Sequence, residues 1–214
     1  MKVFTPSSHV AGSLHAVSRT LAQWFPTPSL ISPRSAGIDI SDSSIKWLVL
    51  GERGSGYYVE AYGEEPLPEN IVVQGAIKDV EALAQVLKKL KQKLHGIDCA
   101  HAALPEEAAY VFEMHVPDGT SREEILHMVE FEFEGRVPIT PEASVFDFDC
   151  IQDHSGPSEE ISVVVFPREL AEEYVAAFDA AGITLLSLEV EARSIARAIS
   201  HPSREEPMTL LVDF

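Results

Sequence analysis

The chain has 214 residues, 45% of them hydrophobic, and it carries 34 Asp and Glu against 16 Lys and Arg, a net charge of −18. This length and apolar content suffice for one large or two small folded domains and exclude a wholly disordered chain. The negative charge repels phosphate backbones and anionic lipid surfaces, so we expect no nucleic-acid partner.

The cysteines and the apolar runs bear on the compartment. Cys99 and Cys150 show no short spacing, and we expect both to be buried free thiols in a reducing compartment. No apolar run reaches the roughly 18 to 20 residues that a membrane-spanning helix needs. Polar residues interrupt the start of the chain, where a secretory signal has its apolar core. Together these features predict a cytoplasmic protein without a transmembrane segment.

Residues 1–35 stand apart as an N-terminal extension. Several prolines surround a stretch in which apolar residues recur at helical spacing: Val10, Leu14, Val17, Leu21 and Trp24. Such a stripe can dock on a membrane, on a partner or on the chain's own domain. With a single Arg on its polar side, the membrane interpretation is the weaker one, and we expect an extension that packs or frays.

From residue 36 onward the pattern predicts an α/β protein. Three short strands form a meander over residues 37–62, and a helix follows with Asp79 as its N-cap and Gly96 just beyond its end. Thr120 and Glu123 have the spacing of a capping box that opens a later helix. The remaining predicted strands are 100–104, 110–116, 144–151, 161–166 and 184–190, and the remaining predicted helices are 120–136, 168–181 and 191–200. The chain closes on an apolar strand, 208–214, with little after it to cover it, so we expect the natural protein to continue.

One stretch, residues 37–46, carries informative chemistry. A buried strand brings Asp39 into a turn of small polar residues, and the returning strand carries Lys46. Turn N–H groups and hydroxyls can surround a phosphate, Lys46 can neutralise it, and Asp39 can hold the water shell of Mg²⁺. A plain polar turn with a surface Lys explains the same residues, so the turn alone leaves both interpretations open.

No other cluster predicts catalysis. The acidic residues near the Glu123 helix are those of a solvated helix face, and the eight His residues lack zinc-site spacing. Ser43 and Ser44 have no His and Asp arrangement that would activate a hydroxyl. We therefore predict no catalytic residue.

Taken together, several motifs in residues 36–214 resemble the PilM family, the actin-like proteins of type IV pilus assembly, which are related to the cell-division protein FtsA. The likeness rests on Gly37-Ile38-Asp39, Ser43-Ser44, Lys46, Gly75-Ala76-Ile77-Lys78-Asp79, Ala103-Leu104-Pro105, Val137-Pro138, Glu191 and Leu211-Val212-Asp213.

The resemblance implies an actin-like (ribonuclease H-like) first subdomain, residues 36–106 plus 183–206, interrupted by an inserted α+β subdomain, residues 107–182. Residues 207–214 would be the first strand of a second half that is otherwise missing. It also implies a cytoplasmic scaffold with at most weak ATPase activity. Its partner would be the N-terminal peptide of a PilN-like inner-membrane pilus protein, which would bring it to the inner face of the inner membrane.

The resemblance further implies ATP and Mg²⁺ as cofactors. By matching position, the nucleotide-binding residues would be Asp39, Ser43, Ser44, Lys46, Glu191 and Asp213, with Asp39 holding Mg²⁺ through water. This chain departs from the family in having Ser41 where relatives have Gly, and Asp42 after it. A carboxylate there would repel a phosphate unless Mg²⁺ or Lys46 offsets it.

Three alternatives remain open from the sequence. An actin-like small-molecule kinase would use the same hairpin to place ATP for phosphoryl transfer. An FtsA-like polymer would be tethered to a membrane by an amphipathic tail. A chain whose nucleotide site has decayed would act purely as a docking module.

Overall fold

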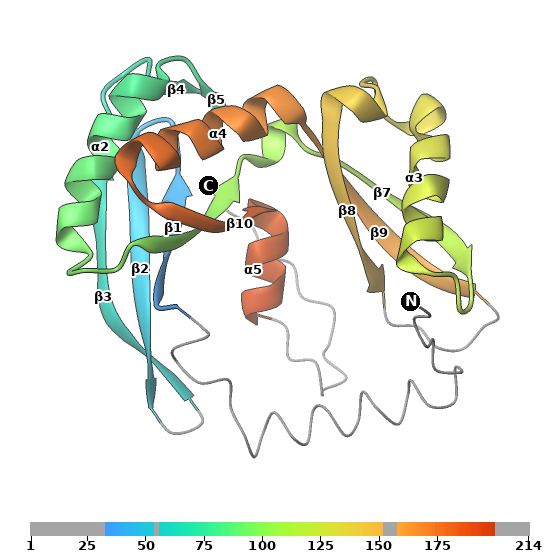
Figure 1. Cartoon of the computed structure of the whole chain (residues 1–214), viewed down its shortest axis with the longest axis horizontal. Coiled ribbons are helices and arrows are strands. Elements are labelled where there is room, and N and C mark those ends of the chain that lie inside the picture. The colour runs from blue at the N-terminus through green and yellow to red at the C-terminus, as the bar shows by residue number, and fades with distance from the viewer. Residues whose placement is uncertain (1–32, 54–55, 152–157, 200–214) are drawn as a thin grey trace, which may run out of the picture.

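The computed structural model describes residues 33–199 except 54–55 and 152–157 (Figure 1). A large mixed sheet lies at one end of the molecule and a smaller antiparallel sheet at the other, with a helix crossing between them. The predicted helical stretch from Val10 to Trp24 and the apolar strand 208–214, with Asp213, lie outside the described residues.

The large sheet has five strands in the order β10-β6-β1-β2-β3. Strands β1, β2 and β3 form the predicted antiparallel meander, and β6 and β10 continue the sheet in parallel to β1. Their bounds are β1 Ser35–Ile40, β2 Ser44–Arg53, β3 Gly56–Pro66, β6 Cys99–Leu104 and β10 Thr184–Val190. The edge strands of this sheet, as described, are therefore β10 and β3.

Alternating side chains on β2 separate a buried from an exposed face of the sheet. Ile45, Trp47 and Val49 are buried, whereas the residues between them are exposed. Two glycines in the β2–β3 pair lie under aromatic rings: a Cβ at Gly63 would meet the ring of Trp47 at 2.8 Å, and one at Gly51 would meet Tyr58. The aromatic rings thus cover the backbone where the glycines have no side chain.

Helices α2 (Val80–Lys93) and α4 (Arg168–Ala181) lie against the buried face of the sheet and against each other. The predicted N-cap is confirmed, because the Asp79 carboxylate accepts a hydrogen bond from the Ala82 N–H at 2.9 Å. Gly182 ends α4 in the left-handed conformation, as expected for a glycine C-cap. The main core consists of the buried faces of both helices and of the sheet.

The small sheet, with strand order β7-β9-β8, and helix α3 (Arg122–Arg136) enclose a second core that includes Val129, Phe133 and Val163. Its strands are β7 Tyr110–Pro117, β8 Ser144–Ile151 and β9 Ser158–Pro167. The capping box of α3 lies one residue later than predicted, on Ser121 and Glu124. The Thr120 hydroxyl instead donates to the carbonyl of Pro117 at 2.6 Å.

Helix α4 lies within the predicted inserted subdomain, residues 107–182, but its buried side chains pack elsewhere. Ala171, Tyr174, Ala177 and Phe178 belong to the core of the large sheet. The second core is made by β7, β8, β9 and α3. Helix α4 therefore follows directly on β9 of the small sheet but packs into the core of the large sheet.

The short hairpin of β4 (Val72–Val73) and β5 (Ala76–Ile77) was not predicted from the sequence. Its turn residues Gln74 and Gly75 have φ of 51° and 72°, and positive φ at both central positions is the requirement of a type I′ turn. Gly75 is also crowded, because a Cβ there would lie 2.3 Å from the Cβ of Pro105. Glycine is thus needed at this position for both its backbone conformation and its size.

Both cysteines are less buried than predicted. Cys99 is partly exposed and Cys150 is exposed, at the edge of the small sheet. The alternation of Cys150 with acidic residues predicts a buried side chain. Cys150 is instead exposed because it lies near the end of β8, at the edge of the small sheet. Within the described residues, no helix has the length and apolar character needed to cross a bilayer.

We predict that Gly75→Ala destabilises the chain by about 2 kcal/mol or more, because the new methyl group would require positive φ and would collide with Pro105. Chemical denaturation followed by circular dichroism measures the change. Gly135→Ala is the matched control: Gly135 lies in α3 with open space around its Cα, so its replacement should be neutral or stabilising. Equal stability of wild type and Gly75→Ala would contradict the crowded turn.

Candidate functional site

The β1–β2 turn is closed by its own serines. The Ser41 N–H donates to the Ser44 carbonyl at 2.9 Å, and the Ser41 hydroxyl donates to the same carbonyl at 3.0 Å. The Ser41 hydroxyl also accepts from the Ser44 N–H at 3.2 Å. Ser44 is 6% exposed, whereas Ser43 is exposed and its carbonyl accepts from Leu67 N–H at 2.8 Å. Of the two predicted phosphate-binding serines, Ser43 is therefore the accessible one.

Asp42 binds the neighbouring β4–β5 turn. Its carboxylate accepts hydrogen bonds from the backbone N–H groups of Gln74, at 2.8 Å, and Gly75, at 3.2 Å. Two N–H donors stabilise a carboxylate and offset part of its charge. The residue that the sequence suggested would repel a phosphate thus has a structural role.

Asp39 and Lys46 lie directly opposite each other on β1 and β2. Both line a cleft of about 500 Å³ on the sheet face opposite α2, together with Leu48, Leu50 and His101. Directly opposite residues of an antiparallel pair share one face of the sheet. The structure therefore brings the predicted carboxylate and the predicted ammonium group to one cavity.

The same cleft is also lined by Glu189, Ser194 and Arg197, which were not predicted as site residues. Glu189 on β10 accepts from Arg197 at 2.6 Å and from the Ser194 hydroxyl at 2.8 Å, both on α5 (Glu191–Ile199). The predicted Glu191 is the first residue of α5 and does not line this cleft. The pair forms because α5 packs back onto β10, so no local sequence pattern indicated it.

A magnesium ion would find few direct ligands here. No group of three or more His, Cys, Asp or Glu suited to a metal occurs in the part of the chain that the structure describes. Mg²⁺ commonly keeps several waters and uses one or two carboxylates plus substrate phosphates. Asp39 fits that pattern as a carboxylate that would hold the ion through water.

Tyr174 connects α4 to the turn that Asp42 binds. Its side chain is fully buried, and its hydroxyl donates to the carbonyl of Gly75 at 2.9 Å. Burial raises the pKa of the Tyr174 hydroxyl, and the negative charges of Asp42 and Asp39 raise it further. The hydroxyl therefore stays protonated and remains a hydrogen-bond donor at physiological pH.

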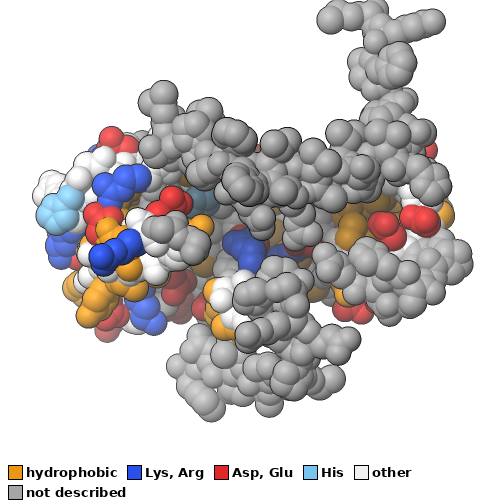
Figure 2. Space-filling model, turned by 90° about the horizontal axis from the view of Figure 1, so that it is seen from below, with side chains coloured by type: hydrophobic (Ala, Val, Ile, Leu, Met, Phe, Trp, Pro, Cys, Tyr) orange, Lys and Arg blue, Asp and Glu red, His pale blue; other side chains and the backbone are white. Residues whose placement is uncertain are grey.

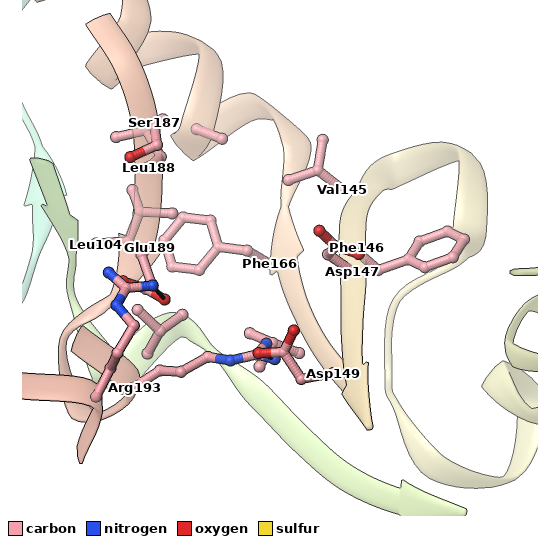
Figure 3. Close-up of a pocket in the computed structure, with 14 residues that line it drawn as sticks. Leu104, Val145, Phe146, Asp147, Asp149, Phe166, Ser187, Leu188, Glu189 and Arg193 are labelled. Carbon is pink, nitrogen blue, oxygen red and sulfur yellow. Dashed lines mark hydrogen bonds and ion pairs between the residues drawn. The ribbon is translucent and has the colours of Figure 1, made fainter. Parts of the chain in front are cut away.

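A second concave site, which we call the seam groove, lies between the two sheets (Figure 3). It has a volume of about 420 Å³ and is bounded by β8 and β10, which among the described strands are edges of the small and the large sheet. Apolar side chains in it include Leu104, Val145, Phe166 and Leu188. Two strand edges thus face an apolar groove.

Charged side chains cross the opening of the seam groove. Arg193 on α5 forms an ion pair with Asp149 on β8 (Figure 3). Burial lowers the pKa of the Arg193 guanidinium and nearby Asp147 opposes this shift, but an Arg side chain stays charged throughout the physiological range. The pair therefore links α5 to the small sheet across the groove.

The chain matches the family of type IV pilus assembly protein PilM over residues 37–209. This match covers most of the chain. The chain therefore belongs to the PilM family.

Two solved structures are similar to this chain. One is described as a PilM–PilN type IV pilus biogenesis complex, with a TM-score of 0.69, 22% identity, and 77% of this chain and 49% of that chain covered. The other is the cytoplasmic domain of EpsL, an inner-membrane component of the type II secretion system of Vibrio cholerae, with a TM-score of 0.52 and 17% identity. That match covers 79% of this chain and 60% of the EpsL chain.

At these identities the likeness is one of fold: the PilM-family chain has the mixed α/β architecture of both structures. It spans about half the length of the chain in the PilM–PilN complex.

We predict that Asp42→Ala speeds amide hydrogen exchange at Gln74 and Gly75 and lowers stability by about 1 kcal/mol, because two backbone N–H groups lose their acceptor. Exchange followed by mass spectrometry or NMR reads out the turn. Asp118→Ala, at an exposed residue after β7, is the control and should leave both amides unchanged. Unchanged exchange in the Asp42 variant would show that the carboxylate does not hold the turn.

Proposed function

We propose that this PilM-family chain is an ATP-binding scaffold of type IV pilus assembly that docks the N-terminal peptide of a PilN-like inner-membrane pilus protein. It would act in the cytoplasm and reach the inner face of the inner membrane through that partner. The observation that carries the proposal is the seam groove, where two edge strands and apolar side chains face each other.

The seam groove suits an extended peptide for a physical reason. An edge strand presents unpaired N–H and C=O groups to which an extended segment can add, while side-chain pockets select its sequence. Strands β8 and β10 supply such edges, and Val145 and Leu188 supply apolar contacts. The ion pair of Arg193 and Asp149 adds a charged group of each sign beside them.

The comparisons support the choice of partner. One similar structure is a PilM–PilN complex, and the other is a domain of an inner-membrane secretion component. A chain of the same family and fold that serves the same kind of assembly is expected to use a similar partner.

ATP would bind with its phosphates at the β1–β2 turn. Asp39 and Lys46 lie opposite each other in one cleft, and Ser43 is exposed at the turn. Lys46 would pair with a phosphate, and Asp39 would hold the water shell of Mg²⁺. Asp42, occupied by Gln74 and Gly75, would leave the turn open to the anion.

We predict that Lys46→Ala weakens ATP binding at least about tenfold, because one charge-assisted hydrogen bond to a phosphate is lost. Isothermal titration of the full-length protein with ATP and Mg²⁺ measures the affinity. Lys88→Ala, on the exposed side of α2, is the charge-matched control and should bind as wild type does. Equal affinity of the two variants would refute the phosphate assignment, and absence of binding in wild type would favour a pure docking module.

We predict that Leu188→Glu abolishes binding of a synthetic peptide with the cytoplasmic N-terminal sequence of the PilN-like protein from the same organism, because a carboxylate would lie in the apolar groove. Fluorescence anisotropy of the labelled peptide measures binding. Leu186→Glu is the control, since Leu186 is exposed on the same strand and does not line the groove. A thermal melt of each variant checks that it is folded, and tight peptide binding by folded Leu188→Glu would place the docking site elsewhere.

A further inference from the structure

The exposed face of the β2–β3 pair carries an apolar surface, most of which lies outside the cleft that is proposed to hold ATP. Five large side chains there are exposed, by 39% for Leu48, 46% for Leu50, 73% for Tyr57, 55% for Val59 and 76% for Tyr62. We call these five residues the ribbon patch. In Figure 2 hydrophobic side chains gather at the lower left, on the side of the molecule where Figure 1 places β2 and β3.

Strand register puts the ribbon patch on one face of the sheet. Leu48 pairs with Tyr62 and Leu50 with Val59, while Tyr57 pairs with Glu52. Since directly opposite residues share a face and strand residues two apart do so as well, the five side chains form one continuous surface. Clusters of large exposed apolar side chains in a folded protein mark a surface that something covers.

We propose that residues 10–24 of the same chain cover the ribbon patch as an amphipathic helix. The segment carries its apolar residues at alternating spacings of four and three, Val10, Leu14, Val17, Leu21 and Trp24, which places them on one helical face. A helix of this length extends about 21 Å. Strand β3 from Tyr57 to Tyr62 extends about 17 Å, so the two surfaces match in size.

The chain enters the sheet beside the patch. Arg34, directly before β1, donates to the Glu60 carboxylate on β3 at 2.5 Å. Ala36 pairs with Val49, which lies between Leu48 and Leu50. Residues 25–33 between the helical stretch and this point can span up to about 30 Å. The segment can therefore reach the patch of its own chain.

Charge favours this occupant. The first 38 residues contain no Asp or Glu, and all 34 acidic residues of the chain follow them. Glu52 and Glu64 lie at the two ends of the ribbon patch on the same face, and Lys46 lies opposite Glu64, so the charge around the patch is net negative. Arg19 lies within the apolar stretch, so docking brings opposite charges together.

The segment after α5 fits the same surface less well. Residues 200–214 carry Glu205, Glu206 and Asp213 against Arg204. Their net negative charge would face Glu52 and Glu64 with like charge. A second copy of this acidic chain would meet the same repulsion.

A segment bound to the ribbon patch would also lie beside the cleft that is proposed to hold ATP. Leu48 and Leu50 line the cleft that holds Asp39 and Lys46. The N-terminal segment would therefore shield one wall of that cleft from water, whether or not ATP binds there.

The test uses the full 214-residue chain and its two tryptophans. Trp47 is buried, so the difference between wild type and Trp24→Phe isolates the fluorescence of Trp24. We expect acrylamide to quench Trp24 several-fold more slowly than it quenches a synthetic peptide of residues 8–32. The double variant Leu50→Glu/Tyr62→Glu should raise the quenching to the level of the peptide, and it should speed tryptic cleavage after Arg19.

The control is Val111→Glu/Phe131→Glu, at two residues that are 59% and 86% exposed but lie on β7 and α3; it should leave Trp24 shielded. Quenching of wild-type Trp24 at the rate of the peptide overturns the proposal, as does shielding that the ribbon-patch variant leaves intact. Shielding that disappears on dilution, with a dimer in sedimentation, would assign the patch to a second copy. Shielding that requires vesicles of phosphatidylethanolamine and phosphatidylglycerol would assign the segment to a membrane.

Discussion

The structure around the candidate site depends on the Gln74–Gly75 turn, on which three parts of the chain converge. The Asp42 carboxylate accepts from both turn N–H groups, and the buried Tyr174 hydroxyl donates to the Gly75 carbonyl. These bonds connect the β1–β2 turn, the β4–β5 hairpin and α4. Because the Tyr174 hydroxyl is fully buried, a movement of the turn would leave it without a hydrogen-bond partner, at a large cost in free energy. The turn thus fixes the β1–β2 hairpin relative to the helix that links the two cores.

That constraint bears on both proposed sites. The fixed hairpin holds Asp39 and Lys46 on one face of the sheet, where they share a cleft. Helix α4 runs from the end of β9 to the start of β10, so it also determines how the edges of the two sheets face each other across the seam groove. The cleft of Asp39 and Lys46 and the seam groove meet at Glu189 and Arg197, which line both. A ligand in one cavity that moves this ion pair would alter the other.

Local sequence signals predicted much of this fold. The three-strand meander, the Asp79 N-cap and the helix over residues 168–181 depend on neighbouring residues, so they can be predicted from a short window. The capping box was displaced by one residue because Thr120 and Ser121 both offer a hydroxyl and Glu123 and Glu124 both offer a carboxylate. The β4–β5 hairpin escaped prediction because its strands have two residues each, too few to show a period.

The site was less predictable because its contacts join distant residues. Asp39 and Lys46 could be paired from the hairpin alone, but Asp42 binds a turn 32 residues later, which no local pattern reveals. The seam groove depends on the packing of two sheets, and the Glu189–Arg197 pair depends on how α5 folds back onto β10. Ser44 is buried although the alternation of β2 would place it on the exposed face with Lys46 and Leu48, so a short sequence window did not indicate its burial.

A crystal structure of the full-length protein with ATP and Mg²⁺ would show whether a nucleotide binds at the β1–β2 turn. We predict phosphate oxygens within hydrogen-bond distance of Lys46 Nζ and the Ser43 backbone, with Asp42 still bound to Gln74 and Gly75. A nucleotide bound away from the β1–β2 turn, or Asp42 turned from Gln74 toward the metal ion, would contradict this prediction.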